Sequence, residues 1–165
     1  METDGRLDTV EIKLKDGQNI ILCQSHFIKT VEDVYEALVT SSSSLKFGIA
    51  FNEASGDRLV RSDGNDKTLT DSSISIAQKI GCGHLLVILL EKGYPINILN
   101  RIKNVDEVTR IYAATANDIS VIVYDDGKDG RGVLGVIDGE KPLGVEGDSD
   151  REKRHKLLRD IGYKR

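Results

Sequence analysis

The segment Leu85-Leu86-Val87-Ile88-Leu89-Leu90 decides the fold, because its six side chains are all apolar and do not alternate with polar ones. Such a run is typical of a strand that is covered on both faces at the centre of a sheet. A helical apolar pattern precedes it and ends at Gly81, which suits the left-handed C-cap of a helix. Pro95, which follows the run, suits the first position of another helix. We therefore expect a central strand with helices before and after it.

Further strands and helices are expected on both sides of this run. Val10, Ile12 and Leu14 alternate with charged residues, which is the period of a half-buried strand, and Asp16-Gly17 predicts a hairpin turn into a second strand. The other expected elements are strands at 47–51, 58–61, 110–116, 120–124 and 133–137, and helices beginning at Thr30, Pro95 and Asp150. This order predicts the α/β class, as a three-layer αβα sandwich on a mixed sheet. We expect residues 1–165 to form a single domain.

Composition narrows the class of protein. The chain has 165 residues and a net charge of -4, which suits one domain and excludes a generally basic coat for nucleic acid. The longest apolar run is far shorter than the ~20 residues that span a bilayer. Met1-Glu2-Thr3-Asp4 lacks a secretory pattern, and two cysteines are too few for a disulfide framework. We expect a cytoplasmic protein without membrane partners, for which nucleic acid is a disfavoured partner.

Gly81-Cys82-Gly83-His84 is the first candidate site. Two glycines let the backbone approach a ligand closely, and a neutral imidazole nitrogen can act as a base, a phosphoryl acceptor or a metal ligand. The alternative is a histidine that is hydrogen-bonded at the end of a strand. One geometric argument opposes a site here, since ligands of parallel sheets lie at the carboxyl ends of strands whereas His84 begins its strand.

Two glycine-containing turns supply further candidates. In Glu53-Ala54-Ser55-Gly56, the carboxylate of Glu53 and the hydroxyl of Ser55 could hold a ribose. In Gly64-Asn65-Asp66, the amide of Asn65 and the carboxylate of Asp66 stand on a tight turn. Both turns also have the ordinary composition of loops, so a purely structural role is the alternative.

Amides recur on the helix that begins at Pro95. Asn97 and Asn100 lie three residues apart, and a carboxamide can pair with an adenine edge through one donor and one acceptor. Lys103, one turn further on, could contact a phosphate, although the same residues could form a solvated face. Thr115-Ala116-Asn117 ends another expected strand, where Thr115 and Asn117 could line a pocket.

Two basic features are open to two interpretations each. Arg131 stands between two glycines. Its guanidinium could bind a phosphate through two parallel hydrogen bonds, or the residue could simply begin a strand. The last segment, 151–165, is basic and could contact the phosphates of RNA. We instead expect Leu157, Leu158 and Ile161 to pack it on the sheet. The sequence has no GxxxxGK[ST] loop, no GxGxxG after a strand and no HExxH.

Several of these stretches together resemble one family, the small prokaryotic family of adenosine-specific kinases. The matching blocks are 46–51 (KFGIAF) with 53–56, then 64–66, 81–84, 94–100 with 102–103, 114–117, 131–139 and 144–147. The resemblance implies a three-layer α/β fold, a trimeric homo-oligomer, a pocket for adenosine or AMP, and a histidine able to carry a phosphoryl group. His84 is the only histidine within the blocks, so that role is carried to it.

Two functional hypotheses follow. In the first, the protein is an adenosine-binding phosphotransferase in which His84 accepts or relays the phosphoryl group and Lys103 and Arg131 neutralise phosphate oxygens. Glu53 or Asp66 then orients the ribose or a metal ion, and the amides of Asn97 and Asn100 read the base. The sequence names no cofactor, and a kinase would use Mg²⁺ together with its phosphoryl donor. In the second hypothesis, the protein is a non-catalytic nucleotide-binding or sensor module.

Overall fold

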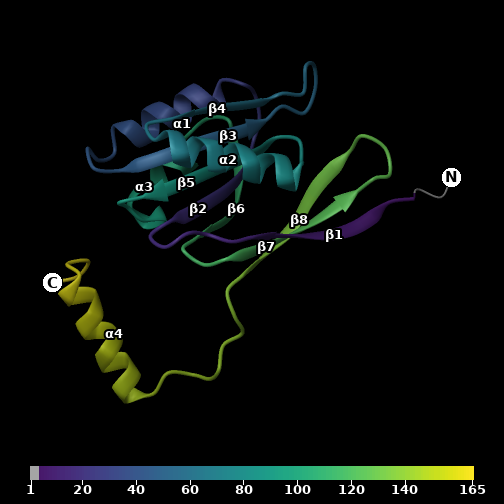
Figure 1. The fold of residues 1–165 in the computed structure, drawn as a ribbon. Coiled ribbons are helices and arrows are strands. Elements are labelled where there is room, and N and C mark those ends of the chain that lie inside the picture. Colours follow the sequence, from purple (N-terminus) through teal and green to yellow (C-terminus); the bar gives the residue numbers. More distant parts are fainter. Residues whose placement is uncertain (1–3) are drawn as a thin grey trace.

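The computed structural model describes residues 4–165. Helices separate groups of one to three strands along the chain (Figure 1). They are β1 (Arg6–Ile12), β2 (Asn19–Ser25), α1 (Thr30–Val39), β3 (Lys46–Asn52), β4 (Val60–Gly64), α2 (Lys67–Ile80), β5 (Leu85–Glu91), α3 (Pro95–Lys103), β6 (Val108–Thr115), β7 (Ile119–Asp125), β8 (Arg131–Asp138) and α4 (Asp148–Asp160). Within the described part of the chain, no helix has the length and apolarity needed to cross a membrane.

The apolar run lies at the centre of the larger sheet. Five strands pair in the order β4-β3-β5-β2-β6, and every residue from Leu85 to Leu90 on β5 is buried. Alternate side chains point to opposite faces of a strand. Leu86, Ile88 and Leu90 join a core with α1 and α3, whereas Leu85, Val87 and Leu89 join a core with α2 and the small sheet β1-β7-β8. The run does not alternate because both faces of β5 are covered.

The α/β class and the three layers are confirmed, and one detail of the sheets differs from expectation. Each strand pairing found within residues 4–165 is antiparallel, so the larger sheet is not mixed. The three crossover helices do connect parallel strands, but an antiparallel strand lies between each pair. β5 separates β2 from β3, for example, although α1 joins them. Helical periodicity in the sequence predicts each crossover helix, but it does not show that another strand is inserted between the two strands that the helix connects.

The hairpin predicted at Asp16-Gly17 is wrong. Gly17 does turn the chain, with a φ of +79°, but β1 pairs with β7 and β2 pairs with β5 and β6. The turn carries the chain from one sheet to the other. Val10 and Ile12 on β1 then pack face to face with the larger sheet rather than edge to edge.

The packing predicted for the last helix is also wrong. None of the residues of α4, all of which the structure describes, is buried, so Leu157 and Leu158 do not anchor it in a core. After β8 the chain runs away from the sheets, and α4 stands apart from them (Figure 1). The local apolar pattern shows which side chains α4 would bury, but not whether a surface of the same chain is there to receive them.

Candidate active site

The backbone of His84 is fixed between two neighbouring strands. The His84 N–H donates to the carbonyl of Asn52 at the end of β3 (2.8 Å), and the Ser25 N–H at the end of β2 donates to the carbonyl of His84 (2.9 Å). Because β5 runs antiparallel to both strands, its first residue is bordered by their carboxyl ends. The objection from parallel sheets therefore does not apply, since the segments that follow two strands meet beside His84.

These two segments and His84 enclose a cavity of about 340 Å³, which we call the His84 cavity. One wall comes from the residues after β2, a second from the end of β3 and the residues after it, and the third is the imidazole. The lining residues are His26, Phe27, Ile28, Phe51, Glu53, Ala54, Ser55 and His84. Three residues proposed from the sequence, His84, Glu53 and Ser55, are thus brought together.

The imidazole of His84 has aromatic neighbours and a strained backbone. It stacks on Phe51 with 6.0 Å between ring centroids and meets His26 edge-on at 6.5 Å. Within residues 4–165 neither ring nitrogen has a hydrogen-bond partner, so this ring is not the hydrogen-bonded strand-end histidine of the alternative reading. His84 has a φ of +59° and Phe27 a φ of +85°. Non-glycine residues in this region cost about 1–2 kcal/mol each and cluster at functional sites.

Asn52 holds the segment that leads into His84. Its buried side-chain amide donates to the carbonyl of Ala77 on α2 (3.0 Å) and to the carbonyl of Cys82 (2.9 Å). One side chain therefore fastens the C-terminal turn of α2 and the Gly81–Gly83 loop to the end of β3. Sequence reasoning missed this role, although a polar residue at the end of an apolar buried strand is a usable signal.

Glu53 forms a fixed negative charge in the cavity wall. Its carboxylate accepts a hydrogen bond from the backbone N–H of Leu59 (2.8 Å) and another from the guanidinium of Arg61 (3.0 Å). These contacts, the Leu59 N–H first, hold the pKa of the Glu53 carboxyl below its usual value. The carboxylate is therefore ionised at neutral pH, and it ties together the loop between β3 and β4.

A second cavity of about 270 Å³ adjoins the first and shares Glu53 and Ala54 with it. Gly81 and Gly83 line it, together with Arg58, an exposed residue whose guanidinium lies 3.7 Å from Asp129 in the loop between β7 and β8. This places a cation and glycine backbone beside the His84 cavity. Sequence analysis treated 58–61 only as a strand and gave Arg58 no role.

Arg131 lies on β8 among carboxylates. Its guanidinium is 3.5 Å from Asp125 and 3.7 Å from Asp8, and its side chain passes beside Gly81. These charges offset its own, and it is not among the residues that line the His84 cavity. Arg131 therefore links the small sheet to the end of α2. These contacts fit the structural role that the sequence left open, rather than phosphate binding.

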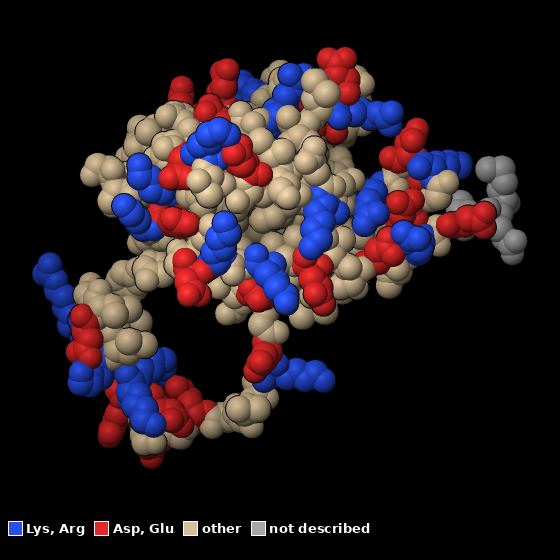
Figure 2. Space-filling view, in the orientation of Figure 1, with Lys and Arg blue, Asp and Glu red and all other residues tan. Residues whose placement is uncertain are grey.

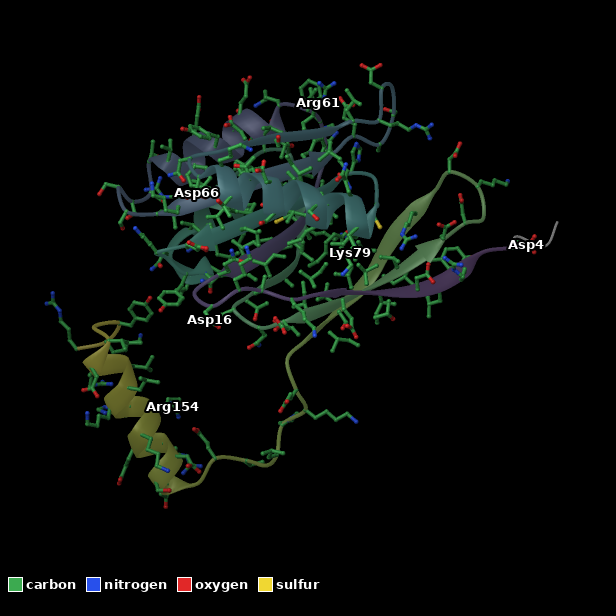
Figure 3. All side chains as sticks on the ribbon, viewed as in Figure 1. Asp4, Asp16, Arg61, Asp66, Lys79 and Arg154 are labelled. Carbon is green, nitrogen blue, oxygen red and sulfur yellow. The ribbon has the colours of Figure 1, made fainter. Side chains whose placement is uncertain are left out.

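Asn65 and Asp66 make local structural contacts near the beginning of β3, at the opposite end of that strand from His84. The Asn65 side chain accepts from the Phe47 N–H (2.9 Å) and donates to the Leu45 carbonyl (2.8 Å). Asp66 caps α2 by accepting from the Leu69 N–H (3.1 Å). Figure 3 labels Asp66 on the side of the molecule away from Arg61, the partner of Glu53.

Replacement of Asp66 by Ala tests the structural role. We expect the free energy of unfolding to fall by about 1 kcal/mol because α2 loses its N-cap, with adenosine affinity unchanged. Urea denaturation and calorimetry measure the two quantities. Asp71→Ala, on the exposed side of the same helix, is the control and should change stability by less than about 0.5 kcal/mol. A tenfold loss of affinity in Asp66→Ala would instead return this residue to the binding site.

A larger cleft of about 770 Å³ lies at the opposite end of β5, and we call it the Asn19 cleft. The side chain of Asn19 is buried there. Its amide donates to the Gly93 carbonyl (3.2 Å), while its carbonyl oxygen has no partner within the described chain. Asn97 lines the cleft and accepts from the N–H of Tyr94 (2.8 Å). Tyr163, near the end of the chain, lines it as well.

The sequence-derived candidates are therefore split between two ends of the sheet. Asn19 pairs with Leu90, so about six residues of β5, or roughly 20 Å, separate the Asn19 cleft from His84. Thr115 lines a smaller pocket that adjoins this cleft, and both Thr115 and Asn117 donate to Asp138 (2.8 and 3.0 Å). Asn100 and Lys103 are exposed on α3. In Figure 3, Asp16 of the cleft is labelled at the lower left of the sheets and Arg61 at the top.

Metal ligands are not clustered in the described part of the chain. No group of three or more His, Cys, Asp or Glu side chains within residues 4–165 is arranged to hold a metal ion. Both cysteines are buried and unpaired, and burial raises the pKa of the Cys23 thiol to about 12. The side chains that line the His84 cavity and the adjoining cavity include two imidazoles, a carboxylate, a hydroxyl and a guanidinium.

Comparisons with known proteins point to one family. The sequence model of a family described as adenosine specific kinase matches residues 10–164. The fold is similar to the crystal structure of the PH1918 protein from Pyrococcus horikoshii OT3, with 42% identity, a TM-score of 0.92, and coverage of 98% of this chain and 99% of that one. No curated protein matches the sequence. Because the likeness covers 98% of this chain, it extends beyond β8 into the segment after Asp138.

Proposed function

The chain belongs to the adenosine-specific kinase family, and from this premise we propose that it transfers a phosphoryl group to adenosine with His84 as the phosphoryl carrier. The observation that supports the carrier role is the placement of one imidazole. Its backbone is held on both sides by strand ends, its ring opens on a cavity, and its nitrogens take no hydrogen bond from residues 4–165. An imidazole so placed keeps a lone pair available for attack on phosphorus.

The His84 cavity offers surfaces suited to a nucleoside. Phe27 is 55% exposed and Ile28 is also exposed, so adenine could stack on an aromatic ring at the mouth. The hydroxyl of Ser55 and the ionised carboxylate of Glu53 lie in the same cavity and could accept hydrogen bonds from ribose hydroxyls. AMP would occupy the same position as the product.

The phosphoryl group moves in two balanced steps. A neutral ring nitrogen of His84 forms a bond to the terminal phosphorus of the donor, and the P–O bond breaks so that the leaving group keeps the electron pair. The 5′ oxygen of adenosine then attacks that phosphorus, the P–N bond breaks, and the hydroxyl proton passes to solvent. Arg58 in the adjoining cavity would neutralise the donor's phosphate oxygens.

The surroundings of the reaction are part of the same proposal. Mg²⁺ would enter with the donor's phosphates, because this ion takes few protein ligands in kinases, and we assign it none. Two buried free cysteines support a reducing, cytoplasmic location. We propose a homo-oligomer, a trimer as the family resemblance implies, and no role for a membrane or nucleic acid.

Calorimetry with adenosine tests where the nucleoside binds. In Phe27→Asn, which preserves the left-handed backbone, we expect affinity to fall about tenfold or more because base stacking is lost. The matched control is Tyr94→Ala, an exposed aromatic residue of the Asn19 cleft, which should bind adenosine as the unmodified protein does. Unchanged affinity in Phe27→Asn would exclude the His84 cavity as the nucleoside site.

One observation favours the second candidate, a non-catalytic nucleotide-binding or sensor module. The Asn19 cleft is larger than the His84 cavity. The buried side-chain carbonyl oxygen of Asn19 could accept a hydrogen bond from the amino group of adenine. This hypothesis predicts the opposite result in the same experiment. Tyr94→Ala would lower the affinity for adenosine, whereas Phe27→Asn would leave it unchanged. No phosphoryl transfer would be detected.

A further inference from the structure

Glu107 is a buried acidic residue that the proposed chemistry does not use. It comes directly before β6, it is only 3% exposed, and the Lys29 ammonium lies 2.9 Å from one of its carboxylate oxygens. Within residues 4–165, no group donates a well-directed hydrogen bond to either oxygen. A buried ion pair of this kind adds little to stability, because the cost of desolvation offsets the attraction. What the pair holds in place is therefore the more informative question.

Many ion pairs of this protein are exposed and differ from that of Glu107. Figure 2 shows acidic and basic side chains interspersed over the surface in view. Lys67 and Asp71 on α2, for example, are 2.7 Å apart, and both side chains are exposed. Such pairs stay solvated and contribute little to the fold. The pair of Lys29 with Glu107 is different because the carboxylate is withdrawn from water.

Glu107 holds the segment 26–29 at both of its ends. The backbone carbonyl of Glu107 accepts a hydrogen bond from the N–H of His26 (2.9 Å), and its carboxylate contacts the ammonium of Lys29. Lys29 is also tied to α1 through an ion pair with Asp33. The two carboxylates, that of Asp33 first, raise the pKa of the Lys29 ammonium above its usual value. Lys29 is therefore charged at neutral pH.

The same segment forms one wall of the His84 cavity. The residues that it contributes to the lining are His26, Phe27 and Ile28. Phe27 is the strained member of the wall, with a φ of +85°. Strain of this kind persists only where the surrounding structure fixes the backbone. The carbonyl of Phe27 accepts from the hydroxyl of Thr30 (2.7 Å), and the two contacts of Glu107 fix the residues on either side of the wall.

We propose that Glu107, through its pair with Lys29, positions the wall formed by residues 26–28 for binding of the nucleoside. The inference rests on the proposed function, in which adenine stacks on Phe27. Glu107 does not line the His84 cavity, so it is a positioning residue and not a catalytic one. Its buried charge fixes the backbone of a strained aromatic residue, which lowers the conformational entropy that the wall loses when the nucleoside binds.

The imidazole of His84 depends on other contacts. The His84 N–H donates to the carbonyl of Asn52, and the His84 carbonyl accepts from the N–H of Ser25. Neither contact involves Glu107 or its ionic partner. Loss of the pair should therefore weaken the binding of adenosine while the imidazole keeps its place.

Calorimetry with adenosine and thermal melting of the full-length protein test the inference together. Glu107→Gln removes the acidic group at nearly constant size, and Lys29→Met removes its partner at similar length. We expect each variant to bind adenosine about tenfold more weakly, because the wall is no longer held at both ends. Lys29→Met should also melt at least about 5 °C lower than the unmodified protein, since it leaves the buried carboxylate unpaired.

The double variant, Lys29→Met with Glu107→Gln, separates positioning from stability. It contains no unpaired buried charge, so it should melt at a higher temperature than Lys29→Met, while its affinity for adenosine stays about tenfold reduced. Lys29→Arg keeps a cation beside Glu107 and should retain the affinity within about threefold. The control is Asp71→Asn, which breaks the exposed pair with Lys67 and should change neither quantity.

Two results would overturn the positioning role. The first is an affinity that follows the melting temperature across these variants, as expected if Glu107 only stabilises the fold. The second is an affinity that is unchanged in both Glu107→Gln and Lys29→Met, although Phe27→Asn loses binding. Failure of the proposed function would look different, because Phe27→Asn would then bind adenosine as tightly as the unmodified protein and the nucleoside site would lie elsewhere.

Discussion

We expect replacement of His84 by Asn to abolish the phosphoryl adduct of the protein and to lower phosphoryl transfer to adenosine at least about 10³-fold. The adduct should be acid-labile, because a bond between phosphorus and imidazole nitrogen breaks readily when the ring is protonated. Intact-mass spectrometry before and after mild acid treatment measures it, and a coupled assay with adenosine measures transfer.

Asn is the informative replacement because of the backbone. His84 has a φ of +59°, a region that Asn enters more readily than most residues with a side chain, so the strand ends around it should keep their hydrogen bonds. Ala would combine the loss of the ring with a change of local strain. A loss of activity in His84→Asn at unchanged melting temperature is therefore a chemical effect.

The other histidines supply matched controls. His155→Asn alters an exposed ring on α4 and should leave the adduct and the transfer rate unchanged. His26→Asn removes the ring that meets His84 edge-on, so it should retain the adduct while affecting adenosine binding. Transfer that survives in His84→Asn would show direct passage from donor to adenosine. An adduct that persists in that variant would place the carrier on another residue.

The largest effect on stability is expected for Gly48→Ala on β3. A Cβ at this position would lie 2.2 Å from the backbone carbonyl carbon of Leu69 and 2.2 Å from the backbone nitrogen of Thr70, both on α2. Backbone cannot rotate out of the way, so α2 must move off the sheet, and Ser73 then loses its hydrogen bond to the Gly48 carbonyl (3.0 Å). We expect a loss of about 3 kcal/mol in the free energy of unfolding.

The control for Gly48 is the same substitution at Gly132. That residue also lies in a strand, its φ is not left-handed, and an added Cβ would meet nothing within 4 Å in the described structure. Gly132→Ala should change stability by no more than about 0.5 kcal/mol. Urea denaturation of both variants measures the difference. Similar losses at the two positions would contradict a close approach of α2 to β3.

Close helix approach at Gly48 has a local cause in the sequence. Gly48 and Ala50 leave one face of their strand bare, which lets a helix or a ligand come near the backbone. The structure shows that the neighbour is α2. The C-cap predicted at Gly81 is confirmed, with a φ of +67°. Both features rest on the small size and conformational freedom of glycine, which are local properties.

The sequence selected some of the residues that line the candidate site. Sequence analysis singled out His84, Glu53 and Ser55, which share a cavity, but it also selected Asn97, Thr115 and Asn117, which lie at the other end of the sheet. It missed His26 and Phe27, because nothing in a short loop after β2 indicates that its neighbours are the residues after β3. That proximity follows from the antiparallel insertion of β5 between them.

The order of strands and helices, the buried central strand and the helix ends were determined by the sequence alone, because periodicity and capping depend on residues a few positions apart. The tertiary structure decided which strands pair, which candidate residues meet at His84, and that no residue of α4 is buried by the rest of its chain. These outcomes depend on contacts between residues far apart in the sequence. A strand inserted between two others changes which residues lie next to each other, and local sequence patterns do not reveal such an insertion.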